Sequence, residues 1–232
     1  MSVVRSARER VHEEVSAEIL AVARTHLARE GGVALSLRSI ARDVGMAPSA
    51  LYRYYSGRDA LLSALILSAY TSLADEAERV ADQAEKGRRS DRERFAAVPR
   101  AMRTWALEHP HEWSLIFGTP VPGYEAPQET VVLYARVASA LVRPIAAADE
   151  AGRLIADNGT RLSAGLRASL APVIDAFEAL PPAVVVSLVE AWATVTGAIS
   201  LELFGHWRNT VLEPAVLFDE FLSRLGASFG LP

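Results

Sequence analysis

The stretch SLRSIARDVGMAPSALYRYY, residues 36–55, decides the fold. Ser36 offers an N-cap oxygen to the first turn of a helix whose apolar residues recur every three or four positions until Gly45. Pro48 fits the first position of a second helix, because an N–H at that position would have no partner within the helix. The stretch therefore predicts two short helices joined by a tight turn.

The second short helix ends in three tyrosines and an arginine, where a solvated face normally carries Lys and Glu. By helical spacing, Leu51 and Tyr55 lie on one face, whereas Ser49, Tyr52 and Arg53 lie on another. A helix-turn-helix can place such a second face against base edges in the DNA major groove. Tyrosines that cover a small three-helix core explain the pattern equally well, since the same geometry also occurs without DNA.

Longer helices flank this pair on both sides. Apolar residues recur at helical spacing over residues 11–27, and the pattern stops at Gly31. A second apolar stripe over residues 61–73 predicts a long helix after the pair. The short helices are therefore wedged between two longer ones.

Residues 10–75 resemble the DNA-binding domain of TetR-type transcriptional regulators. The matching positions are Gly32, Ser36, Ile40, Ala41, Val44, Gly45, Met46, Leu51, Tyr52, Tyr55, Arg58, Leu61 and Leu62. The resemblance implies base contacts for Pro48, Ser49 and Arg53, and phosphate contacts for Ser36, Tyr52, Tyr54 and Arg58. The sequence departs from the family at Ala47, where a capping Ser or Thr is usual, and at Tyr55, where Phe is common.

Composition and charge limit the compartment and the kind of protein. The 232 residues are 50% hydrophobic and 22% charged, and the chain contains no cysteine, so nothing in it requires an oxidising compartment. Residues 1–60 hold nine Arg and seven Asp or Glu, so the net charge of -4 leaves -6 for residues 61–232. The N-terminus lacks the apolar core of an export signal, and two glutamates interrupt the apolar segment 183–204. We predict a cytoplasmic protein without a membrane span.

The C-terminal part carries a second, weaker resemblance. The phrases HPHEWSLIFG and AWATVTGAISLELFGHW resemble the WHG type of TetR C-terminal domain, although Thr196 stands where a histidine is expected. We predict an apolar ligand pocket, entered through a proline-rich loop over residues 118–127 and lined by Trp105, Trp113, Phe117, Tyr134 and Trp192. Aromatic residues at helical spacing are more often plain core. Arg136, Arg143 and Glu190 are candidate polar anchors, and each is equally explained as a solvated or capping charge.

The sequence contains few patterns that indicate catalysis or metal binding. His109 and His111 flank Pro110, and because no third ligand is patterned with them we assign no metal. The sequence contains no phosphate-binding loop, no dinucleotide glycine pattern and no nucleophile elbow. We therefore predict neither a cofactor nor an enzymatic activity.

Together these patterns predict an all-α protein of two domains. Residues 1–56 form a helix-turn-helix DNA-binding domain, and residues 57–232 form a helical bundle for ligand binding and dimerisation. One copy cannot supply two recognition helices about 34 Å apart, so a two-fold symmetric operator requires a homodimer. The predicted interface comprises Val195, Gly197, Ile199, Leu217, Phe221 and Leu225.

The predicted function is a repressor that binds a palindromic operator in double-stranded DNA and is released by a small, largely apolar ligand. Two alternatives remain within the class, an activator of the same fold and a regulator that answers to a protein. A third alternative is a small-molecule binding protein whose helix-turn-helix is only structural. Sequence-specific binding of a DNA duplex separates the regulators from the binding protein.

Overall fold

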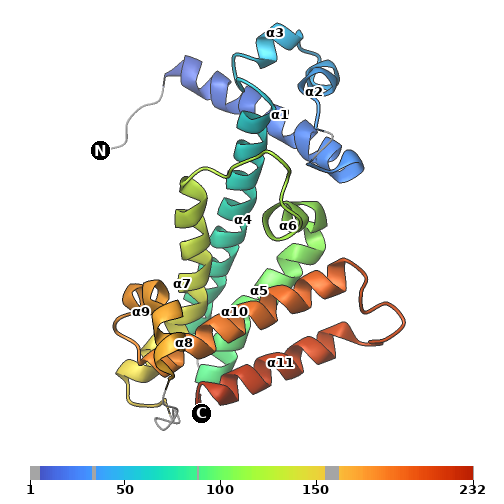
Figure 1. Cartoon of the computed structure of the whole chain (residues 1–232). Coiled ribbons are helices and arrows are strands. Elements are labelled where there is room, and N and C mark those ends of the chain that lie inside the picture. Colours follow the sequence, from blue (N-terminus) through green and yellow to red (C-terminus); the bar gives the residue numbers. More distant parts are fainter. Residues whose placement is uncertain (1–5, 33–34, 88, 155–161, 232) are drawn as a thin grey trace. The chain divides into compact units, whose positions relative to one another are not determined.

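The structure, a computed structural model, describes residues 6–32, 35–87, 89–154 and 162–231 (Figure 1). Within these ranges the chain forms eleven α-helices and no strand. The predicted all-α class is confirmed.

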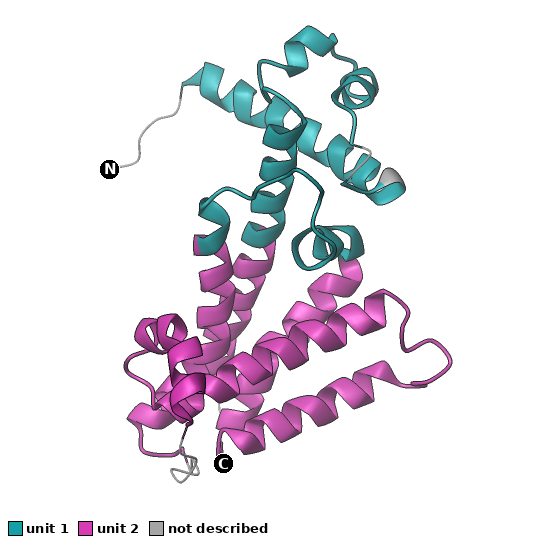
Figure 2. Cartoon of the chain, in the orientation of Figure 1, with its two compact units in different colours: residues 1–71, 109–131 teal, residues 72–108, 132–232 magenta. Residues whose placement is uncertain are grey.

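The chain divides into two compact units. Residues 1–71 and 109–131 form the first unit, and residues 72–108 and 132–232 form the second (Figure 2). The first unit contains α1 (Ala7–Glu30), α2 (Leu37–Asp43), α3 (Pro48–Leu51), the start of α4 (Arg58–Lys86) and α6 (Pro110–Phe117). The second contains the rest of α4, α5 (Asp91–Glu108), most of α7 (Glu129–Glu150), α8 (Ala164–Ser169), α9 (Ala171–Ala176), α10 (Pro182–Leu203) and α11 (Pro214–Ser228).

This division differs from the predicted boundary after residue 56, because α6 and the loop that follows it join the helix-turn-helix. Leu115 of α6 packs against the apolar core of α1 to α4. In the following loop, the hydroxyl groups of Tyr124 and Ser63 lie 3.0 Å apart, which ties the loop to the start of α4. The loop that the sequence predicted as a ligand entrance is thus anchored on the first unit.

The local signals of residues 36–55 act as predicted. Ser36 Oγ accepts a hydrogen bond from the backbone N–H of Ser39, and Gly45 adopts the left-handed φ of 76° that the turn requires. Pro48 is the first residue of α3, as predicted. Local capping and turn chemistry therefore fix where α2 and α3 begin and end.

A buried apolar core holds α3 in place. Leu51, the last residue of α3, has no exposed surface. Burial of a leucine side chain contributes about 1.5–3 kcal/mol, and a helix of one turn has no stability of its own. The core around it consists of Ile19, Ala23, Leu27, Leu35, Leu37, Ile40, Ala41, Leu61 and Leu65.

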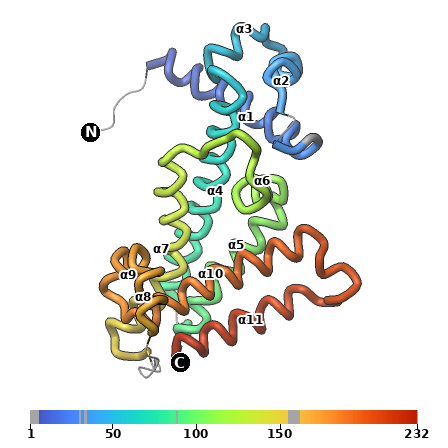
Figure 3. The backbone as a smooth tube through the Cα atoms, in the orientation of Figure 1, coloured from blue at the N-terminus to red at the C-terminus, as the bar shows by residue number. Residues whose placement is uncertain are grey.

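In the second unit, α5 packs against both α10 and α11. Near the end of the chain, the rings of Phe95 and Phe229 meet edge to face at 5.3 Å. Arg92 Nε donates a hydrogen bond of 2.6 Å to the carbonyl of Leu231, so the C-terminus lies beside the start of α5 (Figure 3). These contacts close the core of the second unit.

Two helices, α7 and α10, are long and apolar enough to cross a membrane by length and composition alone. The core helices of soluble proteins meet the same criterion, and so this is weak evidence for a span. Helix α7 also carries Arg136 and Arg143, each in ion pairs with carboxylates of α4. Paired charges of this kind are rare on membrane-spanning helices.

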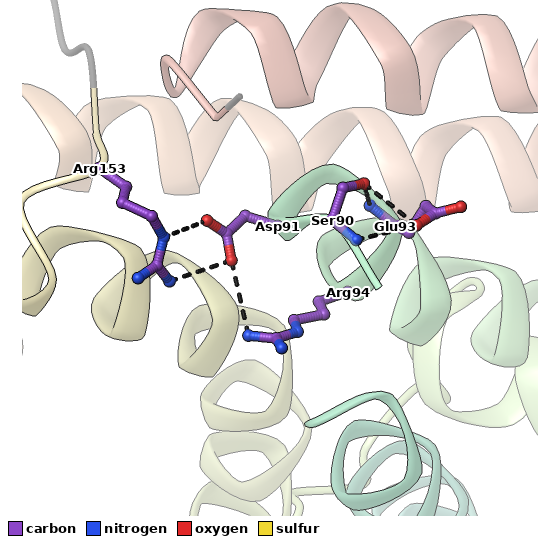
Figure 4. A network of polar contacts seen from close by, with 5 residues as sticks. All are labelled: Ser90, Asp91, Glu93, Arg94 and Arg153. Atoms are coloured by element: carbon purple, nitrogen blue, oxygen red, sulfur yellow. Dashed lines mark hydrogen bonds and ion pairs between the residues drawn. The ribbon is translucent and has the colours of Figure 1, made fainter. Parts of the chain in front are cut away.

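A buried carboxylate joins the start of α5 to the chain after α7 (Figure 4). Asp91 accepts hydrogen bonds from Arg153 Nε and Nη2 at 2.7 and 3.1 Å, and Arg94 lies 3.6 Å away. The bonds from Arg153 hold the pKa of Asp91 below its ordinary value, although burial opposes the shift. Beside it, Ser90 and Glu93 exchange the reciprocal hydrogen bonds of a capping box.

We predict that Asp91→Asn lowers the free energy of unfolding by about 1–3 kcal/mol at neutral pH, because a neutral amide leaves two arginines without their carboxylate. The folded pKa is depressed, so the contribution of Asp91 is present above its unfolded pKa of about 3.9 and is lost as the pH falls through the folded pKa. Denaturant titrations at several pH values measure this. Asp219→Asn, which removes a half-exposed pair with Arg100, is the control and costs at most about 1 kcal/mol. Equal losses in the two variants would contradict the prediction.

Candidate DNA interface

One face of α3 is buried and the opposite face is open to solvent. Leu51 lies in the core, whereas Pro48, Ser49, Tyr52 and Arg53 are exposed. The side chain of Tyr52 is 49% exposed, which is unusual for an aromatic residue of a small core. The three residues predicted at bases, and Tyr52 predicted at a phosphate, are therefore all accessible to a ligand and include hydroxyl and guanidinium donors.

The other two tyrosines of the motif pack against α1. The ring of Tyr54 stacks on His12, with ring centres 4.7 Å apart and planes 15° apart. Tyr55 shares a side-chain hydrogen bond with Ser16, and burial raises the pKa of its phenol. Tyr54 and Tyr55 thus join the end of α3 to α1, while Tyr52 faces solvent.

Ser36 and Arg58, both predicted at phosphates, have structural partners in the same unit. Ser36 caps α2, as described above. Arg58 Nη2 donates a hydrogen bond of 2.8 Å to the backbone carbonyl of Gly32, and its Nη1 lies 3.5 Å from Asp59. Arg58 therefore ties the start of α4 to the chain after α1. The phosphate contacts of both residues stay predictions.

Two exposed arginines of α2 were missed at the sequence level. Arg38 and Arg42 lie four residues apart on the outer side of the helix, and the Arg42 side chain is 77% exposed. Their spacing alone places them on one face, so helical periodicity offered the signal. They add positive charge to the exposed side of α2.

A buried histidine holds α2 against α1. His26 is 5% exposed, and its Nε2 lies 2.8 Å from the carboxylate of Asp43. This hydrogen bond is the main reason why the pKa of Asp43 lies below its ordinary value. Asp43 therefore stays ionised at neutral pH and offsets part of the charge of Arg42, whose Nε lies 3.3 Å away.

The five aromatic residues of the predicted pocket make packing contacts. In the first unit, Trp113 is fully buried and lies 4.4 Å from the ring of Phe117. In the second, Trp105 donates its indole N–H to Ser72 Oγ at 3.0 Å. Tyr134 and Trp192 form an edge-to-face pair at 4.8 Å in the same unit. Their role in a ligand pocket stays a prediction.

Each unit has a hollow that is open on its surface. The hollow of the second unit has a volume of about 600 Å³ and is lined by Glu76, Val80, Gln83, Arg89, Glu93, Ala97, Arg100, Ala101 and Thr104. That of the first unit, of about 570 Å³, is lined by Asp59, Ala60, Ser63, Gly123, Tyr124 and Glu125. Both linings mix polar and apolar residues, and they do not include the five predicted aromatic residues.

The candidate polar anchors on α7 form ion pairs with α4 instead. Arg136 contacts Asp75 and Glu78 at 2.7 and 2.6 Å. One heptad further along both helices, Arg143 contacts Asp82 and Glu85 at 2.9 and 2.8 Å. Glu190, the third candidate, is an exposed residue of α10. Arg136 and Arg143 therefore pair with carboxylates of α4, and their role as anchors for a ligand stays a prediction.

The six residues of the predicted dimer interface fall into two groups. Val195 and Ile199 have no exposed surface in the single chain, so they belong to its own core and have nothing to offer a second copy. Gly197, Leu217, Phe221 and Leu225 are partly exposed. Of the six, only these four have surface left for a second copy, and their role in an interface stays a prediction. The sequence of an apolar helix such as α10 does not reveal which side the core covers.

The described residues contain no group of three or more His, Cys, Asp or Glu side chains that could hold a metal ion. The Nδ1 of His109, considered above as a ligand, lies 3.1 Å from the carboxylate of Glu112. His109 stands at the start of α6, directly before Pro110.

A helix-turn-helix whose second helix is buried on one side and exposes polar residues on the other is typical of DNA-binding proteins of the helix-turn-helix class. Residues 19–65 match the tetR family of bacterial regulatory proteins, and residues 95–225 match the C-terminal domain of tetracyclin-repressor-like proteins. The HTH-type transcriptional regulator Rv1816 of Mycobacterium tuberculosis is 38% identical over 222 residues, which cover 91% of each chain. The chain belongs to the TetR family of transcriptional regulators.

Solved structures share the fold. The crystal structure of SCO4313, described as a regulatory protein, matches with a TM-score of 0.77 and 33% identity, and the match covers 95% of this chain and 98% of that chain. RolR, solved in complex with resorcinol, matches with a TM-score of 0.55 and 16% identity over 96% of this chain and 91% of its own. The likeness to RolR concerns the fold alone.

Proposed function

We propose that the protein is a repressor that binds a palindromic operator as a homodimer and leaves it when a small, largely apolar molecule binds to the helices after residue 56. The observation that carries the proposal is the exposed surface of α3 and of the turn after it, where Ser49, Tyr52 and Arg53 are exposed and Leu51 is fully buried. Arginine recognises guanine through two hydrogen bonds, and hydroxyl groups bind phosphates. The face thus combines donors for both kinds of contact.

The surface of α10 and α11 supports the homodimer. The exposed side of α10 is largely apolar, with Val189 38% and Leu201 41% exposed and Glu190 as its charged residue. A Cβ added at Gly197 would meet no atom of the described residues within 4 Å, so a second helix can approach closely there. On α11, Phe221 is partly exposed, and its ring lies 6.4 Å from the ring of Trp207. Apolar surface of this extent favours burial against a second copy.

Contacts within the first unit support a coupling between α6 and the helix-turn-helix. Arg24 of α1 donates a hydrogen bond of 2.8 Å to Glu112 of α6 and one of 2.7 Å to Ser68 of α4. A shift of α6 would therefore displace α1 and α4 together. Helix α4 also continues from the first unit into the second. A ligand that binds in the second unit and shifts α4 would therefore act on the chain that follows α3. RolR illustrates that this fold can hold a small aromatic molecule.

An activator of the same fold would bind DNA equally well. A repressor and an activator therefore differ only in whether the bound protein lowers or raises transcription. A small-molecule binding protein with a merely structural helix-turn-helix would bind no duplex selectively. An enzyme is not proposed, since the family and the relatives are transcriptional regulators.

The DNA part is tested by selecting duplexes from a randomised pool and comparing variants on the selected sequence. We expect Arg53→Ala to lose about 1–3 kcal/mol of discrimination at one base pair and to melt at the temperature of the unaltered protein, because Arg53 is exposed. Arg58→Ala should lower the melting temperature, because it removes the bond to Gly32. A pool from which the unaltered protein enriches no sequence would rule out the proposed function, and equal selectivity of Arg53→Ala would rule out its base contact.

The homodimer is tested by placing a charge on the half-buried flank of α11. We expect Phe221→Glu to give a folded monomer in sedimentation, because a carboxylate on this flank would be buried without a partner in the dimer. Ser223→Glu adds the same charge on the exposed, opposite side of α11 and should remain a dimer. If Phe221→Glu sediments as a dimer of unchanged affinity, the interface lies elsewhere.

The ligand response is tested by calorimetric titration of aromatic compounds, resorcinol among them, with and without the selected duplex. A true effector binds more weakly to the protein–DNA complex than to the free protein. The loss of effector affinity equals the loss of DNA affinity that the effector causes, and a hundredfold loss corresponds to about 2.7 kcal/mol. We expect Arg24→Ala to bind the effector but to lose most of this coupling. Arg29→Ala, an exposed change on the same helix, should keep it. Binders whose affinity is the same in both titrations would contradict the ligand-release proposal.

A further inference from the structure

A row of three side chains on α1 follows the turn between α3 and α4. Arg8, His12 and Ser16 are four residues apart, so they share one face of the helix. Two of them are fixed by contacts to that turn: Ser16 shares a hydrogen bond with Tyr55, and His12 stacks on Tyr54. Arg8, one turn earlier on the same face, continues the row beyond the stacked pair.

The outer part of this row is exposed and carries the positive charge of Arg8. Arg8 and His12 are both exposed. The neighbouring Glu9 turns its carboxylate to the start of the helix, where it accepts the backbone N–H of Ser6 at 2.7 Å. Arg10 lies about 200° around the helix from Arg8, on the opposite side. The row therefore presents donors in one direction, beside the turn that follows α3.

Stacking positions the imidazole of His12 without using its hydrogen-bonding atoms. The parallel contact with Tyr54 involves the faces of the two rings, whereas the two nitrogens of His12 lie at the ring edge. An imidazole that served only to cover Tyr54 could be replaced by any flat apolar ring. An imidazole beside an arginine and a phenol hydroxyl, in contrast, offers donors that suit an anion with several oxygens.

We propose that Arg8 and His12 contact the DNA backbone, so that the DNA interface extends from α3 onto the first half of α1. The inference rests on the proposed DNA binding. When α3 lies in a major groove, the residues beside it meet the phosphates that border the groove. Arg8 and His12 flank α3 through the Tyr54 stack, and they therefore add affinity and fix orientation without reading bases.

The test compares variants of the full-length protein on the selected duplex and on an unrelated duplex of equal length. Arg8→Ala and His12→Phe should each weaken binding to both duplexes about three- to tenfold at low salt, and Arg8→Ala should also flatten the salt dependence by about one phosphate contact. The phenyl ring keeps the stack on Tyr54, so a purely structural role of His12 would leave binding unchanged. Arg10→Ala removes the same charge from the opposite side of α1 and should bind as the unaltered protein does.

Thermal melting of each variant separates loss of contact from loss of folding, and a weakened variant with an unchanged melting temperature supports the inference. Unchanged affinity and salt dependence of both Arg8→Ala and His12→Phe would overturn it while leaving the proposed function standing. An equal loss in Arg10→Ala would also overturn it, because the effect would then come from net charge rather than from the row. If the unaltered protein binds neither duplex, the proposed function itself has failed, and this inference fails with it.

Discussion

The burial of Leu51 is the constraint on which the rest of the DNA-binding unit depends. Helix α3 spans only Pro48–Leu51, and a single turn cannot persist in water without tertiary contacts. Its fully buried last residue joins it to α1, α2 and α4, and the Tyr54 stack and the Tyr55 hydrogen bond brace the following turn against α1. Since one side of so short a helix is fixed in the core, the direction of Tyr52 and Arg53 is fixed as well. The same packing that stabilises the unit therefore orients its exposed donors.

Ion pairs in the second unit align α4 with α7. The same arrangement of one arginine and two carboxylates occurs twice along the two helices, and neither occurrence is a strong contact alone. Arg136 lies between two carboxylates of α4, and Arg143 repeats the arrangement seven residues later, with all donor–acceptor distances between 2.6 and 2.9 Å. Each arginine is about one third exposed, so each pair alone contributes little. Two equivalent pairs at heptad spacing nevertheless fit one register of the two helices. Because α4 also reaches the helix-turn-helix, its register bears on both units.

The sequence was sufficient where local chemistry decides the structure. The cap at Ser36, the turn at Gly45 and Pro48 at the first position of α3 need no distant partner, and the structure confirms all three. It was insufficient where a side chain finds its partner far along the chain. Arg58 bonds the carbonyl of Gly32, 26 residues earlier, and helical spacing contains no sign of that contact. The side of α10 that the core covers could not be predicted for another reason, since a helix this rich in apolar residues gives no indication that Val195 is buried while Gly197 is partly exposed.

The central claim is that two copies of α3 enter successive major grooves of one duplex. Hydroxyl-radical footprinting of the protein on a selected duplex tests it most directly, because it maps the protected backbone on both strands. The account predicts two protected patches related by a two-fold axis, with centres about one helical turn, or 34 Å, apart. A single protected patch, or protection that does not depend on the duplex sequence, would contradict it.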